Sequence, residues 1–492
     1  MRILILAFLI ALSQFAIAQR HILTADDMDF DAETNTLKFF SFDLYNHDYT
    51  SIVVPDSVNG TAIKKIGNNA ACILTVNGLD SLIISEGVET IGDYAFFRCY
   101  LNYIYLPNTI KYIGTYAFND NNIKSLKIPN SITHIGTDAF SLNQIETIDF
   151  EGVTQLDTIP SNAFKYNDIS GTLTIPDNVK VIDSGAFYYN SIDSIVYPET
   201  VEILGGFQGN NISGALHIPS HVKTIGPSAF RGNNISELTF DEGITKIDAY
   251  AFAGNDSLTD IIFPNSLKSI GTQAFFGLDL VSITFGDSIS KLYSYCFGLN
   301  RIKDITVPGQ LTLLGEGAFY RNMAGTNYQN NIVVEEGITE IPEKCFAEMQ
   351  ILGSLSLPST LVEIKPNAFF NTFALSEYLV LPTSVSTTEG MQFSHWVSYE
   401  DSIDNVIDEV TSIVGGKSYG YKAIFASTAI DNIKSTDNSL IINGNTIRSE
   451  NSTFEVYTIS GSRIFVGTQT QLQRGIYIVK PYNSVGSVIR IP

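Results

Sequence analysis

One short pattern recurs along most of the chain and limits the possible folds more than any other feature. In its clearest copy, Phe118 is followed by Leu126, Ile128 and Pro129 and then by the next Phe, Phe140. The repeated Phe stands at Phe96, Phe118, Phe140, Phe164, Phe187, Phe207, Phe230, Phe252, Phe275, Phe297, Phe319, Phe346 and Phe369, with Ala71 in its place at the start. Most of these positions are 22 or 23 residues apart, a spacing typical of repeat proteins. Because no single copy can bury its apolar side alone, we predict a solenoid of about fourteen stacked copies over residues 61–384.

Each copy contains an alternation that predicts a short strand. Leu126 and Ile128 flank Lys127, which is the period of a strand with one buried side, and identical stacked strands must form a parallel sheet. Proline follows the strand in nine copies, at the place where ladder pairing stops and an N–H is not needed. The apolar spacing between Ile135 and Phe140 predicts one helical turn on the opposite side. The expected fold class is therefore an α/β repeat solenoid, with a parallel β-sheet on one face and short helical turns on the other.

An asparagine stands three residues after the repeated Phe in nine copies. Its register between buried apolar positions predicts burial, and a buried amide needs hydrogen-bond partners. We predict an asparagine ladder that satisfies backbone groups of its own and neighbouring copies; an exposed turn asparagine is the alternative. The ladder positions are Asn121, Asn143, Asn167, Asn190, Asn210, Asn233, Asn255, Asn300 and Asn322.

The order Leu-x-x-Leu-x-Leu with a following Asn or Cys is that of leucine-rich repeats. The Ile-Gly-x-x-Ala-Phe segment and the proline after the strand narrow the class further. Over about residues 40–384 the chain resembles the BspA-type (Treponema pallidum-like) leucine-rich repeat family. The resemblance implies a protein displayed at a cell surface.

The chain begins like a secreted protein. Residues 1–18 combine Arg2, an apolar run and an Ala-Ile-Ala site before Gln19, which predicts a cleaved signal peptide; an uncleaved anchor is the alternative. The run is too short for a membrane span, and no later stretch is longer, so we expect none in the mature chain. Residues 19–60 are expected to cap the open end of the solenoid. Their closely spaced aspartates lack the Gly and Glu that complete an EF-hand loop, so a solvated acidic edge is expected rather than a calcium site.

Two small β domains are expected after the repeats. Residues 385–428 contain an F-x-x-W motif from Phe393 and a closing Y-x-A-x-F from Tyr421, which resembles the Listeria–Bacteroides repeat; a plain cap of the last copy is the alternative. Residues 429–445 are rich in Ser, Thr, Asn and Asp and predict a linker.

The last domain, residues 446–492, shows the order V-Y-x-x-x-G…L-x-x-G-I-Y-I-V-K. This order resembles the C-terminal sorting domain of the type IX secretion system, although the chain departs from the family pattern by ending in Pro492. The resemblance implies a Bacteroidetes-type source, the secretion machinery as a partner, and a final location outside the outer membrane. Cleavage or anchoring of the domain stays open.

The four cysteines occupy repeat positions rather than a disulfide framework. Cys99 stands in the asparagine position of its copy, and Cys296 and Cys345 directly precede a repeated Phe. We interpret Cys296 and Cys345 as buried small side chains, and Cys99 as the usual substitute for the ladder asparagine. A bridge between Cys72 and Cys99 is the alternative.

No catalytic, cofactor or metal motif stands out. The six histidines are scattered, and His217 and His221 lack a third ligand at zinc spacing. No phosphate loop follows a predicted strand, and the run Gly416-Lys417-Ser418-Tyr419-Gly420 matches the letters of a Gly-x-Ser-x-Gly elbow without its strand–turn–helix context. We therefore expect no enzyme activity, no cofactor and no metal. The net charge of −22 disfavours nucleic acids and anionic membranes as partners.

The remaining source of function is the surface, because stacked strands display one outward residue per copy as a ridge. The expected binding face comprises Tyr103, Tyr105, Lys127, Asp149, Thr174, Val196, His217, Thr239 and Ile262. Its two tyrosines favour the N-terminal half as the contact region. The hypothesis is an exported cell-surface protein that binds an extracellular protein or glycan in the manner of adhesins. The alternatives are a structural surface-layer component and a secreted enzyme that uses the repeats as a scaffold.

Overall fold

The computed structural model divides into two compact units, residues 1–301 and 302–492, which are described separately here. The described residues are 20–40, 51–71, 79–323, 330–349, 352–370 and 372, and beyond these the backbone of the strands from β34 onward. The predicted signal peptide, residues 1–18, lies outside the described residues. Among the residues that are described, no helix has the length and hydropathy needed to cross a membrane.

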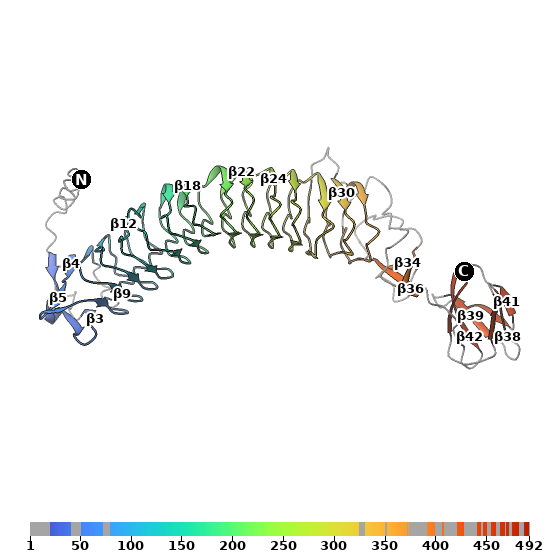
Figure 1. The fold of residues 1–492 in the computed structure, drawn as a ribbon, viewed down its shortest axis with the longest axis horizontal. Coiled ribbons are helices and arrows are strands. Elements are labelled where there is room, and N and C mark those ends of the chain that lie inside the picture. The colour runs from blue at the N-terminus through green and yellow to red at the C-terminus, as the bar shows by residue number, and fades with distance from the viewer. Residues whose placement is uncertain are drawn as a thin grey trace. The chain divides into compact units, whose positions relative to one another are not determined.

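Unit 1 (residues 1–301) is a parallel β-solenoid, so this part of the prediction is confirmed (Figure 1). Each turn of the solenoid, called here a coil and named by its repeated Phe, contributes one strand to a main sheet and one to a second sheet. The strands of the main sheet are β1 (Arg20–Ile22), β4 (Ser51–Val54), β8 (Ser81–Ile84), β10 (Tyr103–Tyr105), β12 (Ser125–Lys127), β14 (Thr147–Asp149), β16 (Ser170–Thr174), β18 (Ser191–Val196), β20 (Ser213–Ile218), β22 (Asn234–Phe240), β24 (Asp260–Ile262) and β26 (Ser282–Thr284). The strands of the second sheet are β3 (Thr36–Phe40), β7 (Lys65–Ile66), β9 (Thr90–Ile91), β11 (Tyr112–Ile113), β13 (His134–Ile135), β15 (Thr158–Ile159), β17 (Val181–Ile182), β19 (Ile203–Leu204), β21 (Thr224–Ile225), β23 (Lys246–Ile247), β25 (Ser269–Ile270) and β27 (Lys291–Leu292).

The two sheets differ in continuity. Main-sheet strands pair in the groups β1-β4-β8-β10, β12-β14, β16-β18, β20-β22 and β24-β26, whereas the second sheet runs through β3-β7-β9-β11-β13 and again from β15 to β27. All of these pairings are parallel. The main sheet is therefore interrupted at regular intervals while the coils continue.

The N-terminal residues add to both sheets. β1 pairs with β4, and β3 pairs with β7 on one side and with the antiparallel strand β2 (Met28–Asp31) on the other. Between β1 and β2 lies the short 3-10 helix η1 (Ala25–Asp27), and a second antiparallel pair is formed by β5 (Ser57–Val58) and β6 (Thr61–Ala62). The ring of Phe40 lies 6.0 Å from that of Phe96, at the start of the phenylalanine row in the core.

The predicted alternation in the main strand is confirmed in coil 118. Leu126 and Ile128 are buried, and Lys127 between them is exposed. Leu126 stands opposite Ile148 of the next coil, so the buried side of each strand meets the buried side of its neighbour. Pro129 follows directly after the strand pairing ends.

The helical turn predicted between Ile135 and Phe140 is wrong. Ile135 ends strand β13, and within the described part of the chain no α-helix occurs. Two residues with left-handed backbone explain the difference: Asp138 (φ 54°) lies two before Phe140, and Leu142 (φ 56°) lies two after it. A left-handed residue interrupts the helical hydrogen-bond series.

The left-handed residues turn alternate N–H groups toward the neighbouring coil. The N–H of Phe118 donates to the carbonyl of Ala139 at 2.8 Å, and that of Tyr116 donates to Thr137 at 3.0 Å. Gly136 permits this close approach, since a Cβ atom there would lie 2.4 Å from the backbone nitrogen of Thr115. Bonds that a helix would make within itself thus join one coil to the next.

The core of unit 1 contains one continuous row of rings. From Phe96 to Phe297 the repeated phenylalanines are fully buried, and successive ring centroids lie 5.2 to 5.8 Å apart in stacked geometry. Large aromatic side chains contribute most of the apolar burial of a core of this kind. The row therefore fixes the register of the coils independently of the sheets.

Unit 2 (residues 302–492) begins with the same type of coil. Its main strands β28 (Asp304–Val307), β30 (Asn330–Val334) and β32 (Leu352–Ser356) are parallel, as are the two-residue strands β31 (Glu340–Ile341) and β33 (Glu363–Ile364). The strand β29 (Leu313–Leu314) precedes them. Phe319, Phe346 and Phe369 stack with centroid distances of 5.8 and 5.4 Å.

The rest of unit 2 is antiparallel. The strands β34 (Met391–Ser398), β35 (Val406–Ile407) and β36 (Tyr421–Ser427) lie in the segment expected to be a small β module, and β36 pairs with β33 of the last coil. The remaining strands form two sheets, β37-β38-β41 and β40-β39-β42-β43. They are β37 (Leu440–Asn443), β38 (Thr446–Ser449), β39 (Phe454–Thr458), β40 (Arg463–Gly467), β41 (Gln469–Gln471), β42 (Gly475–Pro481) and β43 (Ser487–Ile491).

Candidate binding face

All nine residues of the expected binding face lie in strands of the main sheet, and their register brings most of them together in pairs. Lys127 stands opposite Asp149, Thr174 opposite Val196, and His217 opposite Thr239. Val196 is 54% exposed and Ile262 is 73% exposed, whereas Tyr103 and Tyr105 in β10 are only half-exposed. The face is a row of outward side chains whose most exposed apolar members, Val196 and Ile262, lie in its middle and at its C-terminal end.

Side chains on this face contact one another across coils. The Nζ atom of Lys127 lies 2.7 Å from a carboxylate oxygen of Asp149, and Nδ1 of His217 lies 3.0 Å from the hydroxyl of Thr239. Partial burial opposes ionisation of Asp149, but hydrogen bonds from Lys127 and from the N–H of Glu151 prevail, so the pKa of Asp149 lies below its usual value. Burial, with a smaller effect of Tyr105, raises the pKa of Tyr103.

A second outward row, two residues before the first, was missed by the sequence analysis except at Tyr103. The hydroxyls of Thr172 and Ser194 hydrogen-bond at 2.7 Å, and Ser282 donates to Asp260. The period-two alternation already implies this row, because the two neighbours of a buried strand residue both point outward. The display face is therefore two residues wide in each coil.

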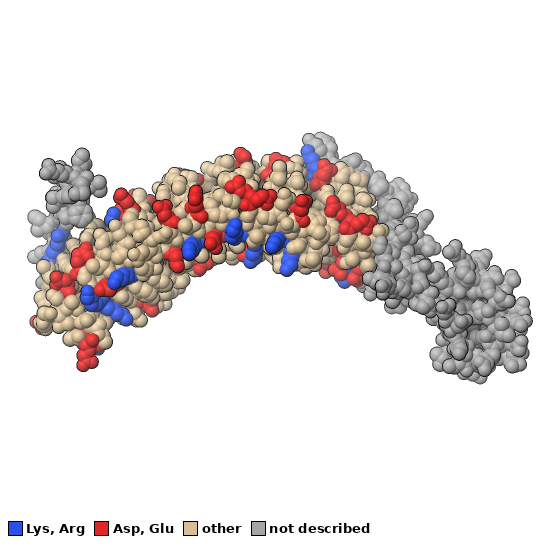
Figure 2. All heavy atoms as spheres, in the orientation of Figure 1, with Lys and Arg blue, Asp and Glu red and all other residues tan. Residues whose placement is uncertain are grey.

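The two sheets differ in their content of basic side chains. In the main strands β8 to β26 of unit 1 the only Lys or Arg is Lys127, while carboxylates occur in four of these strands. Nine lysines stand in or directly before second-sheet strands: Lys38, Lys64, Lys65, Lys111, Lys180, Lys223, Lys246, Lys268 and Lys291. Figure 2 shows blue spheres along the margin where Figure 1 places the two-residue strands. The main-sheet face thus favours cationic over anionic partners.

The main sheet opens between β14 and β16. Each of these strands pairs on its other side only, β14 with β12 and β16 with β18. A cavity of about 620 Å³ lies in the opening, lined by residues 146–154, 169–170 and 172–177. Its charged lining residues are Glu146, Asp149, Glu151 and Asp177, with no Lys or Arg among the residues that form it.

Coil 140, whose strand β14 borders the opening, is longer than its neighbours. The corner between Phe150 and Ile159 is two residues longer than the corner between Ile128 and Ile135 in coil 118, and Glu151 replaces the usual proline. Ile148, which occupies a core position in β14, is half-exposed. The 24-residue spacing from Phe140 to Phe164 and the missing proline were the sequence signals that could have located this site.

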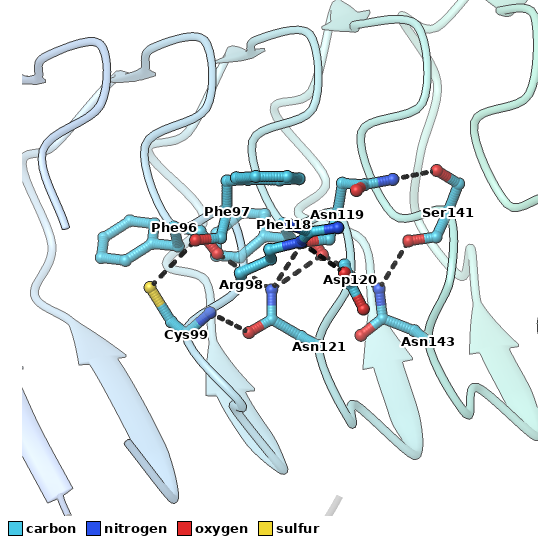
Figure 3. A network of polar contacts seen from close by, with 10 residues as sticks. All are labelled: Phe96, Phe97, Arg98, Cys99, Phe118, Asn119, Asp120, Asn121, Ser141 and Asn143. Carbon is cyan, nitrogen blue, oxygen red and sulfur yellow. Dashed lines mark hydrogen bonds and ion pairs between the residues drawn. The ribbon is translucent and has the colours of Figure 1, made fainter. Parts of the chain in front are cut away.

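The nine predicted ladder asparagines are all buried and make repeated contacts with backbone groups. The Nδ2 atom of Asn143 donates to the carbonyls of Phe118 and Phe140 at 2.9 and 3.1 Å, and its Oδ1 accepts from the N–H of Ile123 at 3.1 Å. Asn121 makes the same contacts one coil earlier, and Figure 3 shows its bonds to the carbonyls of Phe96 and Phe118. Each amide thereby joins its own coil to the preceding one at both its nitrogen and its oxygen.

Two residues other than Asn in the asparagine position also contact a backbone carbonyl of the preceding coil. The sulfur of Cys99 lies 3.6 Å from the carbonyl of Ala71, the position that a Phe carbonyl occupies in later coils. In coil 369 the hydroxyl of Thr372 donates to the carbonyl of Phe346 at 2.6 Å. Thr372 was not predicted, because a single threonine outside the Asn or Cys pattern gives no signal in the sequence. Within the described residues, no group of His, Cys, Asp and Glu side chains is placed to hold a metal ion.

Three solved structures are similar to part of the chain. A leucine-rich repeat protein from Bacteroides ovatus is 17% identical with a TM-score of 0.47, covering 67% of this chain and 94% of its own. A leucine-rich cell surface protein from Faecalibacterium prausnitzii is 23% identical with a TM-score of 0.39, covering 65% and 82%. The pneumococcal vaccine antigen PcpA is 18% identical with a TM-score of 0.34, covering 71% and 76%.

The sequence itself contains the repeats of one known family. None of the curated proteins compared with the chain matches it. The family described as BspA type leucine-rich repeat region matches in six copies, over residues 64–193, 223–328 and 323–453, which together make up well over half of the chain. The chain therefore belongs to the BspA-type leucine-rich repeat family.

Proposed function

We propose that this chain is exported to the cell surface, where the main-sheet face of unit 1 binds an extracellular protein or glycan in the manner of adhesins. The observation that carries the proposal is the register of that face, which aligns outward side chains coil after coil. Val196 and Ile262 add exposed apolar area to it. Repeat solenoids use extended faces of this kind for binding.

The proposed face is tested by two double substitutions of the mature chain, residues 19–492. Val196→Arg with Ile262→Arg changes the main-sheet face, and Ile203→Arg with Tyr112→Arg changes exposed residues of the second sheet. We expect binding to extracellular matrix proteins or glycans on an array to fall by about tenfold or more in the first variant only. Equal loss in both variants, or no binding partner across broad arrays, would contradict the proposal.

Export is supported by the signal-like residues 1–18 and by the resemblance of residues 446–492 to a type IX sorting domain. We expect deletion of residues 446–492 to leave the protein in the periplasm, because the sorting signal is lost while the leader remains. The measurement is protease accessibility on intact cells, with a periplasmic protein as the control. Normal surface exposure of the truncated chain would refute the sorting role.

A further inference from the structure

We propose that the opening between β14 and β16 is a docking slot for an extended segment of a partner protein, in which basic residues alternate with apolar ones. The segment would enter as an added strand. This inference rests on the proposed function, since it names the class of partner for one part of the same face.

The slot contains unpaired backbone groups with which an added strand could form hydrogen bonds. In the described residues no backbone hydrogen bond joins 146–153 to 169–177, so the groups of β14 and β16 that face each other have no strand partner. Unpaired strand edges bind extended peptides through main-chain hydrogen bonds. The slot provides two such edges rather than one.

The slot is bounded at its ends and is not a general separation of coils. Just before the strands, the N–H of Asp168 donates to the carbonyl of Ile145 at 3.0 Å. In the core, the N–H of Phe140 donates to Ala163 at 2.9 Å, and the rings of Phe140 and Phe164 stay stacked at 5.6 Å. The coils are thus held together while their main strands stand apart.

At another interruption of the main sheet, a side chain bridges the two unpaired strands. Between β18 and β20, the hydroxyl of Tyr197 donates to the carbonyl of His217 in the next coil. The equivalent residue of coil 140 is Phe150, whose ring lies edge-on to that of Phe164 at a centroid distance of 6.1 Å. Phe150 therefore packs inward and cannot bridge the gap, because it has no hydroxyl.

The residues that line the slot determine which side chains the partner segment can place there. Ile148 and Phe150 present apolar surface inside the slot, while Glu146, Glu151 and Asp177 are exposed around it. Side chains of a strand alternate between two sides. An incoming strand would place one set on the apolar lining and the other among the carboxylates, so the second set is lysine or arginine.

The test uses synthetic nine-residue peptides and the mature chain, residues 19–492. We expect a peptide of alternating Lys and Val to bind at least about tenfold tighter than one of alternating Glu and Val, because the slot carries only negative charge. Methylation of alternate backbone nitrogens in the Lys-Val peptide removes its donors on one edge and is expected to weaken binding by about tenfold. Hydrogen exchange should slow over residues 146–153 and 169–177 when the Lys-Val peptide binds.

A matched pair of variants separates the slot from the overall negative charge. Glu146→Gln, Glu151→Gln and Asp177→Asn together should weaken Lys-Val binding by about tenfold or more. Asp193→Asn, Glu199→Gln and Glu237→Gln remove the same charge from exposed positions elsewhere on the unit and should change it by less than about twofold. Equal loss in both triple variants, or unchanged binding of the methylated peptide, would overturn the proposal.

Failure of this proposal is distinguishable from failure of the proposed function. If the peptide does not bind but Val196→Arg with Ile262→Arg still abolishes binding on the array, the slot is refuted and the face stands. If the peptide binds through the slot but Val196→Arg with Ile262→Arg does not reduce binding on the array, the slot is supported and the broader face is refuted.

Discussion

Coil 118 and coil 140 are built from the same pattern but differ at the main sheet. Both contain a stacked Phe and a buried ladder asparagine, with nearly the same contacts to their neighbours. In coil 118 the main strand pairs with the next one, whereas in coil 140 it does not. The comparison indicates that the phenylalanine and asparagine rows hold the coils together, and that strand pairing on the display face is dispensable.

The largest expected effect concerns the shared core. Phe140→Ala should lower the free energy of unfolding by about 4 kcal/mol, because it opens a cavity in the fully buried ring row. Phe150→Ala should cost about half as much, since its ring lies beside the opening and outside that row. Urea denaturation of both variants measures the difference. Equal losses would mean that the opening is as tightly packed as the core.

The ladder is expected to be equally strong at the boundary between coils 118 and 140 and at the boundary between coils 140 and 164, where the main sheet opens. Asn143→Ala and Asn167→Ala should each lower the free energy of unfolding by about 3 kcal/mol, because each leaves buried backbone groups without a partner. Asn122→Ala serves as the control, since that amide lies nearer the surface and should cost less than about 1 kcal/mol. A much smaller loss for Asn167 would show that the ladder weakens where the sheet opens.

Shortening the corner should convert coil 140 into a copy of coil 118. Deletion of the exposed Thr154 and Gln155 restores the usual spacing and is expected to let β14 pair with β16. The predicted result is slower amide exchange over residues 146–150 and loss of Lys-Val peptide binding. The free energy of unfolding should change by less than about 1 kcal/mol, because the deleted side chains are solvated. Unchanged exchange would mean that the corner length does not cause the opening.

The smallest expected effect is electrostatic. Lys127→Ala removes the partner that helps to lower the pKa of Asp149, so this pKa should rise toward its usual value in an NMR titration. A lowered pKa stabilises the fold above the usual carboxylate range, and this contribution is lost as the pH falls through the lowered value. The variant should therefore show less loss of stability on acidification. At neutral pH the change should stay below about 1 kcal/mol, since both side chains are largely exposed.

The parts of the fold that depend on burial were predictable from the sequence. The Phe and Asn positions recur in register, and the alternation around Lys127 defines which side of the strand is buried. The second sheet was not predictable, because its left-handed turns contain residues such as Tyr116, Asp138 and Leu142, which do not mark that conformation. The apolar spacing there fits a helix equally well, and only contacts with the next coil decide between the two.

The candidate site was also only partly predictable from the sequence. The outward row was predictable from the period of the strand, but the charge difference between the two sheets was not, since it required the register of the second sheet. Two sequence features accompany the opening: the longer spacing from Phe140 to Phe164, and Glu151 in place of the usual proline. Whether two additional residues bulge outward or separate the strands depends on packing that no local pattern encodes.

The hydrogen bonds that run from the turns of one coil to the turns of the next have a consequence for how such proteins change over generations. Every coil offers donors on one side and acceptors on the other, in the same places as its neighbours. A duplicated coil would find ready partners at both of its boundaries, and a lost coil would leave none behind. The molecule can thus be lengthened or shortened by whole coils. A slot like the one beside coil 140 can arise at one coil without disturbing the others.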